Sequence, residues 1–223
     1  MAAWDDLRLT LARLVEERPG ALTRSPNLDG DGETPPYPVG LAPWAEVLAR
    51  ELYERFGDQV HLTVGALPYP PGRAPRRPRP ARPSGEAALL NPGEAGAELE
   101  GPAVVRSGHT LRHGLLVRNH ADAELAIATN GMVTASVVDP RTGDVVGGYS
   151  GFQTLPLVMF RVPPGGTERI PLLVGTASFT PRLGYAVPPG SWGIQATLRL
   201  VPGRDVREQV ARRTPVLPLT VTG

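Results

Sequence analysis

The sequence predicts a mainly β protein, in which a C-terminal antiparallel β-sandwich follows a small α-rich N-terminal segment. From about residue 98, short runs of β-forming apolar residues recur at regular spacing, and clusters of Gly, Pro, Asn and Asp separate them. Before residue 68, apolar residues instead recur at helical spacing in two stretches. With 223 residues, 41% of them hydrophobic, the chain is long enough to bury a real core.

The N-terminal region, residues 1–67, predicts a helix–helix–strand segment. In the first stretch the apolar residues that share one helix face are Leu7, Leu11, Leu14 and Val15. In the second, which begins at Pro43, the apolar stripe consists of Trp44, Val47, Leu48, Leu52 and Phe56. The strand follows where apolar and polar residues alternate, with Val60, Leu62 and Val64 on one face. Because this core is thin, we expect the segment to dock on the C-terminal domain or on a partner.

A linker rich in proline and arginine is predicted over residues 68–97. Its first part, PYPPGRAPRRPRPARPSG, has no apolar period, carries five arginines and contains no acid. Such a segment favours the polyproline II conformation. It could contact nucleic acid or anionic lipid, or offer PRRP as a PxxP ligand. Because prolines interrupt the charges, we expect a spacer and no nucleic-acid partner.

The sandwich is predicted over residues 98–223. The stretch LLVRNHADAELAIATNG, residues 115–131, is typical of strand, turn and strand, and predicts a hairpin. Before the last strand, the sequence allows either a long loop or a short helix over the segment PGRDVREQVARRTP. The expected strands cover residues 102–106, 111–118, 123–129, 132–138, 144–149, 157–162, 168–174, 183–187, 192–200 and 215–222.

Composition excludes several classes of site. The chain has no cysteine, which rules out disulfides, zinc–thiolate centres and thiol nucleophiles. All 23 basic residues are arginine, so a Schiff-base or phosphate-loop lysine is excluded. Together with 26 Gly and 26 Pro, this usage is typical of a high-GC bacterial genome. The first residues do not form a signal peptide, and no apolar stretch reaches the ~18 residues of a membrane span, so a cytoplasmic location is expected.

Two motifs suggest metal binding. In NLDGDGE, Asn27, Asp29 and Asp31 fit the start of an EF-hand loop, but Pro38 occupies the twelfth position, where the loop needs a carboxylate. In HTLRH, His109 and His113 are four residues apart, which places the rings about 13 Å apart along a strand, too far for one ion. His120 lies beyond them. We therefore expect no metal and no cofactor, and interpret these residues as a polar turn and surface histidines.

Catalytic motifs are missing from the sequence. It contains no G-x-S-x-G, no P-loop and no H-E-x-x-H. Ser107, Ser150 and Ser178 have no base that the sequence places beside them, and a hydrolytic triad needs all three parts. We therefore expect a protein that is not an enzyme.

Three stretches resemble an immunoglobulin-like sandwich. VPPGSWGIQATLRL, residues 187–200, has a Pro/Gly turn, an aromatic and an alternating strand, as at a late corner of such domains. LLVRN with the turn at Asn119 resembles the early central strand, and DPRTGDVVGG resembles a mid-domain hairpin. In this order, residues 102–200 are similar to the intracellular proteinase inhibitor family of β-sandwich domains. The resemblance implies the sandwich fold and an inhibitor activity, and transfers no functional residue.

The function expected from these features is a non-catalytic protein-interaction or accessory module in the cytoplasm, with a protein partner that the sequence does not identify. An intracellular proteinase inhibitor and a structural subunit of a larger assembly are the alternatives. The candidate contact residues are large apolar side chains near turns. They are Phe152, Leu155, Leu157, Met159, Phe160, Phe179, Leu183 and Tyr185. The competing interpretation places most of them in the core.

Overall fold

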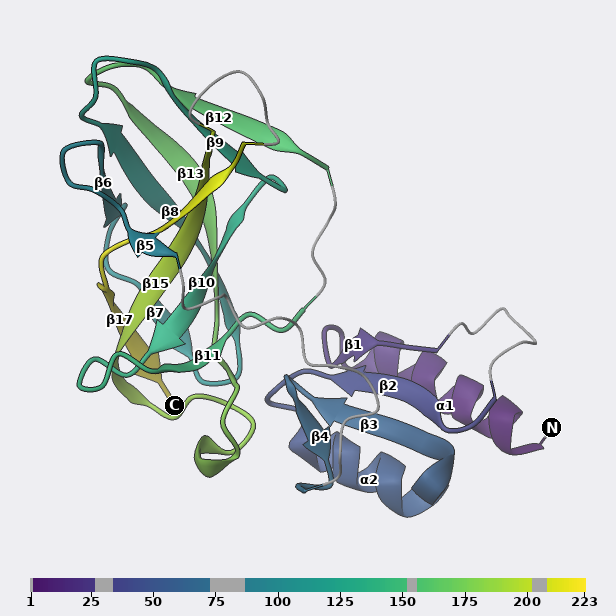
Figure 1. Ribbon diagram of the computed structural model, residues 1–223. Helices are drawn as coiled ribbons and strands as arrows, with labels where there is room; N and C mark the ends of the chain where they lie inside the picture. The colour runs from purple at the N-terminus through teal and green to yellow at the C-terminus, as the bar shows by residue number, and fades with distance from the viewer. Residues whose placement is uncertain (1, 27–33, 73–86, 152–155, 202–207) are drawn as a thin grey trace.

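The computed structural model describes residues 2–26, 34–72, 87–151, 156–201 and 208–223, which form two packed units (Figure 1). The first is a small α/β unit that ends at residue 72, and the second is a β-sandwich. Most of the named elements are strands, so the predicted mainly β class is confirmed. No described helix combines the length and the apolar composition that crossing a bilayer requires.

The N-terminal unit is a four-stranded sheet with two helices. Its strands lie in the order β1 (Leu22–Arg24), β2 (Tyr37–Leu41), β3 (Val60–Val64) and β4 (Leu67–Tyr69). α1 (Ala2–Glu17) precedes the sheet, and α2 (Glu46–Phe56) connects β2 to β3, which are parallel. A short 3₁₀ turn (Gly57–Gln59) follows α2. The core joins one side of each helix to the sheet, and its largest fully buried side chains are Leu7, Leu11, Val39, Leu41, Val60 and Leu62.

The two helices and the strand at 60–64 lie where the sequence predicts them, but three further strands were missed. β2 escaped prediction because Pro38 and Gly40 interrupt its apolar pattern. The predicted helix faces are also wrong in part. Val15, Trp44 and Val47 are 52%, 40% and 56% exposed instead of buried.

The sandwich has two layers that enclose one core. The first layer contains β6 (Ala95–Leu99), β8 (Thr110–Asn119), β13 (Thr167–Gly175), β10 (Val133–Val138), β15 (Gly190–Val201), β17 (Leu217–Thr222) and β7 (Val104–Arg106). The second contains β12 (Val158–Val162), β9 (Leu125–Thr129), the end of β15, β16 (Val210–Arg213) and β5 (Ala88–Leu89). β11 (Val145–Gly148) and β14 (Ala177–Ser178) extend the first layer beside β10. Most pairs are antiparallel, but β10–β13, β16–β5 and β17–β7 are parallel.

β15 belongs to both layers. Residues 190–196 pair with β17 and β10, and residues 197–201 pair with β16 and β9. Strands that change layer in this way make the corners of a sandwich. The β15 side chains Ile194, Ala196, Leu198 and Leu200 all point into the shared core, as their alternation predicts.

The predicted hairpin over residues 115–131 is wrong, because β8 and β9 do not pair with each other. β8 pairs with β13 and β6, whereas β9 pairs with β12 and β15. Between β8 and β9 the chain crosses from one layer to the other, and the completely buried Asn119 stabilises this turn. Its Nδ2 donates to the carbonyls of Ala123 (2.8 Å) and Val162 (2.9 Å), and its Oδ1 accepts from the Ala121 amide. The Asn119 turn therefore moves the chain from one layer to the other.

The boundaries of the sandwich also differ from those expected. β5 and the first residues of β6 lie within the predicted linker, and β6 pairs with β8 along its whole length. The proline- and arginine-rich residues 73–86 lie outside the described residues. A predicted strand at 183–187 is instead the end of a 3₁₀ turn (Pro181–Leu183) and a single bridge between Ala177 and Ala186. The segment left open before the last strand supplies β16, while residues 202–207 are outside the described part.

Candidate binding site at the junction of the two units

Tyr185 of the sandwich is packed into the core of the N-terminal unit. Its side chain is 8% exposed, and its ring centroid lies 6.1 Å from that of Tyr69. The hydroxyl donates a hydrogen bond to the carbonyl of Pro68 at 3.3 Å. Burial, with smaller contributions from Glu46 and Tyr69, raises the pKa of Tyr185 to about 12. The two units are therefore joined by an aromatic side chain that stays neutral and largely out of water.

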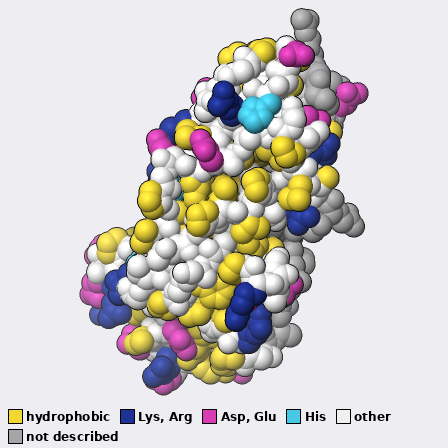
Figure 2. Space-filling view, turned by 90° about the vertical axis from the view of Figure 1, so that its left-hand side faces the viewer, with side chains coloured by type: hydrophobic (Ala, Val, Ile, Leu, Met, Phe, Trp, Pro, Cys, Tyr) yellow, Lys and Arg dark blue, Asp and Glu magenta, His cyan; other side chains and the backbone are white. Residues whose placement is uncertain are grey.

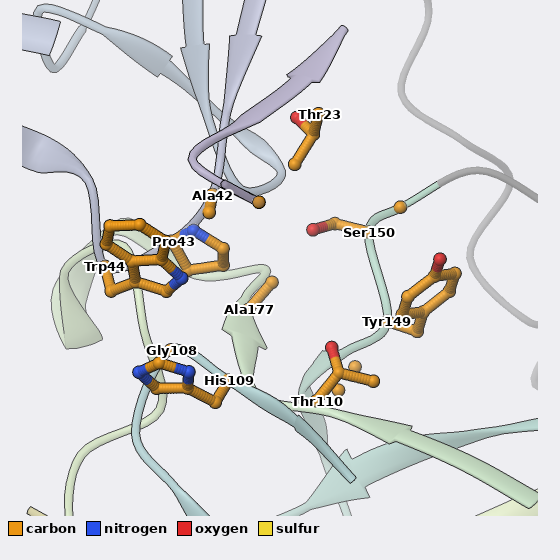
Figure 3. A pocket seen from close by; sticks show the side chains of 14 residues that line it. Thr23, Ala42, Pro43, Trp44, Gly108, His109, Thr110, Tyr149, Ser150 and Ala177 are labelled. Carbon is orange, nitrogen blue, oxygen red and sulfur yellow. The ribbon is translucent and has the colours of Figure 1, made fainter. Parts of the chain in front are cut away.

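The junction also contains a cleft that both units line, which we call the junction cleft (Figure 3). Its volume is about 170 Å³. The N-terminal unit contributes Gly20, Thr23, Ala42, Pro43 and Trp44. The sandwich contributes Gly108, His109, Thr110, Gly148, Tyr149, Ser150, Gly151, Gly175 and Ala177.

One wall of the cleft is a stacked aromatic pair. The rings of Trp44 and His109 are nearly parallel, at 8°, with their centroids 5.9 Å apart. The buried hydroxyl of Thr176 donates to the carbonyl of His109 at 2.9 Å and fixes the chain that carries the imidazole. Gly108 permits the close approach, because it has φ +79° and a side chain there would meet Trp44 at 3.1 Å. The pair is thus held from both units before any ligand binds.

The chemistry of the cleft is neutral and polar. No carboxylate and no arginine is present among the described lining residues, where His109 and Tyr149 are the titratable groups. Thr23 of the N-terminal unit and Ser150 of the sandwich both line the cleft in Figure 3. At about 170 Å³ the cleft is smaller than the ~300–1,000 Å³ of typical small-molecule sites. Its size suits a single side chain of a larger ligand.

One residue that lines the cleft, Trp44, is also exposed at the surface. Trp44 precedes α2 and is 40% exposed, while Val47, the second residue of α2, is 56% exposed. On the sandwich, Val104 and Val216 are each 50% exposed. Figure 2 shows apolar side chains gathered on both units of the face that looks left in Figure 1. The junction therefore combines a recess with an exposed aromatic side chain.

The serines and histidines noted in the sequence occupy different places. The Ser107 hydroxyl donates to the Val187 carbonyl (2.7 Å), and the buried Ser178 hydroxyl donates to the Thr180 carbonyl (2.8 Å), so both bind backbone. His113 Nε2 contacts the Gly101 carbonyl, and His120 Nδ1 contacts the Pro92 carbonyl. With His109 stacked on Trp44, the three imidazoles make separate contacts. The described residues hold no group of three or more potential metal ligands, and Asn27, Asp29 and Asp31 lie outside them.

The predicted contact residues that the structure describes do not form one patch. Phe152 and Leu155 lie outside the described residues. Leu157 is 57% exposed at the start of β12, where Phe160 packs partly against the sandwich core. Met159 packs on the outer side of the same sheet, with Ala126, Ala128 and Val201.

The other predicted residues lie beside the junction. Phe179 is half-buried near Gly148, Leu183 packs partly against the sandwich core, and Tyr185 is buried between the units. Sequence reasoning missed Trp44 as a surface residue, because it assigned Trp44 to the buried stripe of α2. The signal that could have found it is Pro43, since a residue next to the first turn need not share the phase of the helix.

The chain was compared with known proteins. No protein-family model and no curated protein matches it. Among solved structures, it is similar to the ASH/PapD-like domain of human CEP192, with 11% identity over 67% of this chain and 98% of that one, at a TM-score of 0.28. The CooA pilin subunit of enterotoxigenic Escherichia coli has 8% identity over 58% and 99%, at 0.29. Spo0M, a sporulation control protein from Bacillus subtilis, has 10% identity over 58% and 49%, at 0.26. We draw no function from similarities at this level.

Proposed function

We propose that this protein is a non-catalytic protein-binding module whose partner binds at the junction of the two units. The observation that carries the proposal is Trp44, which is 40% exposed at the rim of the junction cleft and stacked on His109. Tryptophan is enriched among the residues that dominate binding energies at interfaces. Because the stack already holds the ring, a partner would lose little rotamer entropy in binding it.

The surroundings of Trp44 support a protein ligand. Val47, three residues after Trp44, is a second exposed apolar residue, and the cleft offers room for one uncharged side chain. An anchor residue in a small recess, surrounded by weaker apolar contacts, is the usual organisation of a protein interface. The site lies between units whose relative position is fixed by Tyr185, so it is formed in the free protein.

The finer assignments belong to the same proposal. We assign the sandwich to the immunoglobulin-like type and the protein to the cytoplasm, without a cofactor or metal. The inhibitor alternative requires a loop that enters a protease cleft. The described loop at 179–187 contributes Tyr185 to the junction, which favours the interaction module over inhibition. A structural subunit of an assembly would use the same surface with fixed stoichiometry.

The proposal is tested with Val47→Glu in the full chain. Val47 is 56% exposed, so the substitution leaves the core intact and places a charge three residues after Trp44. The matched control is Leu9→Glu on α1, where the native side chain is 64% exposed. A photo-crosslinking residue at position 47, or at position 9 as control, is introduced in cells that naturally produce the protein. The full chain is required because Tyr185 completes the core of the N-terminal unit.

We expect a specific crosslinked protein from position 47 and none from position 9. Val47→Glu should weaken binding of that protein, and Trp44→Ala should weaken it by about 30-fold or more, which corresponds to ~2 kcal/mol for an interface anchor. Leu9→Glu should bind normally. Equal crosslinking from both positions, or unchanged binding by Val47→Glu and Trp44→Ala, would show that the junction is not the binding site.

A further inference from the structure

Among the described strands, β12 forms the edge of the second layer. Within the described part of the chain, β12 pairs with β9 alone. An edge strand presents unpaired N–H and C=O groups that can bind another strand, and proteins commonly block such edges with charges, prolines or short length. Figure 1 shows β12 at the end of the sandwich away from the N-terminal unit.

The other described edges carry such protection. β1, β4 and β7 have three residues each, with Pro68 inside β4, and β5 and β14 have two. β6 equals β12 in length, but acids flank and interrupt it at Glu94, Glu98 and Glu100. If two copies of β6 paired about Ala97, Glu94 would lie opposite Glu100, an unfavourable contact of like charges.

β12 has one charged side chain, Arg161, and it is already paired. Its Nη1 lies 2.5 Å from Oε1 of Glu124. The remaining residues of the strand are apolar and half-buried or buried, and Leu157 just before it is 57% exposed. A strand that joined this edge would therefore find apolar contacts and no unpaired charge.

We propose that β12 binds β12 of a second copy of this chain, in an antiparallel pair with its two-fold axis at Phe160. The sequence LVMFRVP, residues 157–163, is self-complementary in this register. Leu157 lies opposite Pro163, Val158 opposite Val162, and Phe160 opposite its own copy. Met159 lies opposite Arg161, so the two arginines avoid each other.

In the proposed pair, side chains that face the core in one copy meet side chains that face the core in the other. Phe160 and Val162 point toward the sandwich core, and Phe160 is only partly covered there. An aromatic pair at the two-fold axis would cover both rings, and cross-strand aromatic pairs stabilise antiparallel sheets. Met159 and Arg161 lie on the outer face. The pairing is short compared with a standard interface of ~1,600 Å², so we expect a dissociation constant in the micromolar range.

Position 159 allows a test in which two variants have opposite effects. Met159→Glu places an acid opposite Arg161 of the other copy, twice in each dimer, whereas Met159→Lys places a like charge there. From the energies of single cross-strand charge pairs, Met159→Glu should lower the dissociation constant by about 2- to 30-fold, and Met159→Lys should raise it by a similar factor. Any loss of stability from replacing a half-buried methionine would act on both variants alike.

Sedimentation velocity of the full chain between about 1 and 500 μM measures the dimer, a range that brackets micromolar dissociation. Hydrogen exchange at the two ends of this range locates the contact. We expect a monomer–dimer equilibrium, a shift of opposite sign in the two variants, and slower exchange of β12 amides at high concentration. A wild-type monomer at every concentration would overturn the proposal, as would shifts of the same sign or slower exchange confined to other strands. Thermal unfolding of dilute samples confirms that each variant is folded.

Discussion

Replacing Tyr185 tests whether the two units unfold as one structure. The ring comes from the sandwich but is 8% exposed within the core of the N-terminal unit. Truncating a buried aromatic residue to alanine costs ~3–5 kcal/mol, and at a junction we expect Tyr185→Ala to lose about 3 kcal/mol. Tyr185→Phe removes only the hydroxyl, whose hydrogen bond to Pro68 is long at 3.3 Å, and should lose about 0.5–1 kcal/mol.

Urea unfolding measured by tryptophan fluorescence distinguishes these outcomes. Trp4 and Trp44 belong to the N-terminal unit and Trp192 to the sandwich, so the signal follows both. Wild type and Tyr185→Phe should unfold in one transition, while Tyr185→Ala should unfold in two, the less stable unit first. The reasoning is refuted if Tyr185→Ala is as stable as wild type, or if Tyr185→Phe loses as much as Tyr185→Ala.

The pKa of Tyr185 adds a pH dependence to the same comparison. Its folded value is about 12, above the ordinary value of 10, so the unfolded chain loses this proton first as the pH rises. The contribution of neutral Tyr185 to stability is therefore complete below pH 10 and is lost between pH 10 and pH 12. Tyr185→Phe has no such proton, and its stability should fall less steeply over this window. Equal slopes for the two proteins would contradict the assignment of the raised pKa to burial at the junction.

Three further substitutions test the sandwich. Asn119→Ala removes the three hydrogen bonds at the crossing between layers and should lower the free energy of unfolding by about 2–4 kcal/mol in urea titrations. Thr214→Val keeps the shape of a fully buried side chain but removes the hydroxyl that accepts a hydrogen bond from the Ala196 amide. The buried amide loses this partner, so a loss of about 1–3 kcal/mol in the free energy of unfolding is expected by the same method. In Gly114→Ala the new methyl would meet the Glu100 carboxylate and displace it from Arg169, the contact that chiefly holds the Glu100 pKa below its ordinary value. An NMR titration should then find that pKa raised toward the ordinary value, with stability little changed because the pair is exposed.

Local pattern predicted the elements of the sandwich better than their partners. Alternation placed β8, β13 and β15 within one or two residues, because period-two burial is a property of each strand alone. The pairing partners of a strand depend on which layer it enters. The local sequence does not distinguish a tight hairpin from a turn that carries the chain into the other layer. The hydrogen bonds of buried Asn119 decided that point, and they require the carbonyl of Val162, 43 residues away.

The residues of the candidate site were likewise easier to pick out from the sequence than their contacts. Helical spacing assigned Trp44 to the buried stripe of α2, but α2 begins at Glu46, so Trp44 lies outside the helix and its phase does not apply. Tyr185 was predicted as a possible contact residue near a turn, and it does make a contact, but with the N-terminal unit of its own chain. Its burial could not be predicted without knowing where that unit docks.

The position of β15 has a consequence for the order of folding. This one strand pairs with β9, β10, β16 and β17, and its residues lie more than 50 positions after those of β9 and β10. During synthesis, β9 and β10 therefore emerge well before β15. Until β15 is made, the edge of each strand that will pair with it has no partner. Chains dominated by such distant pairings fold slowly, and partly formed sheets are prone to aggregate. The N-terminal unit, whose strands are neighbours in sequence, can begin to form while the sandwich is still being made, and its core is completed when Tyr185 packs into it.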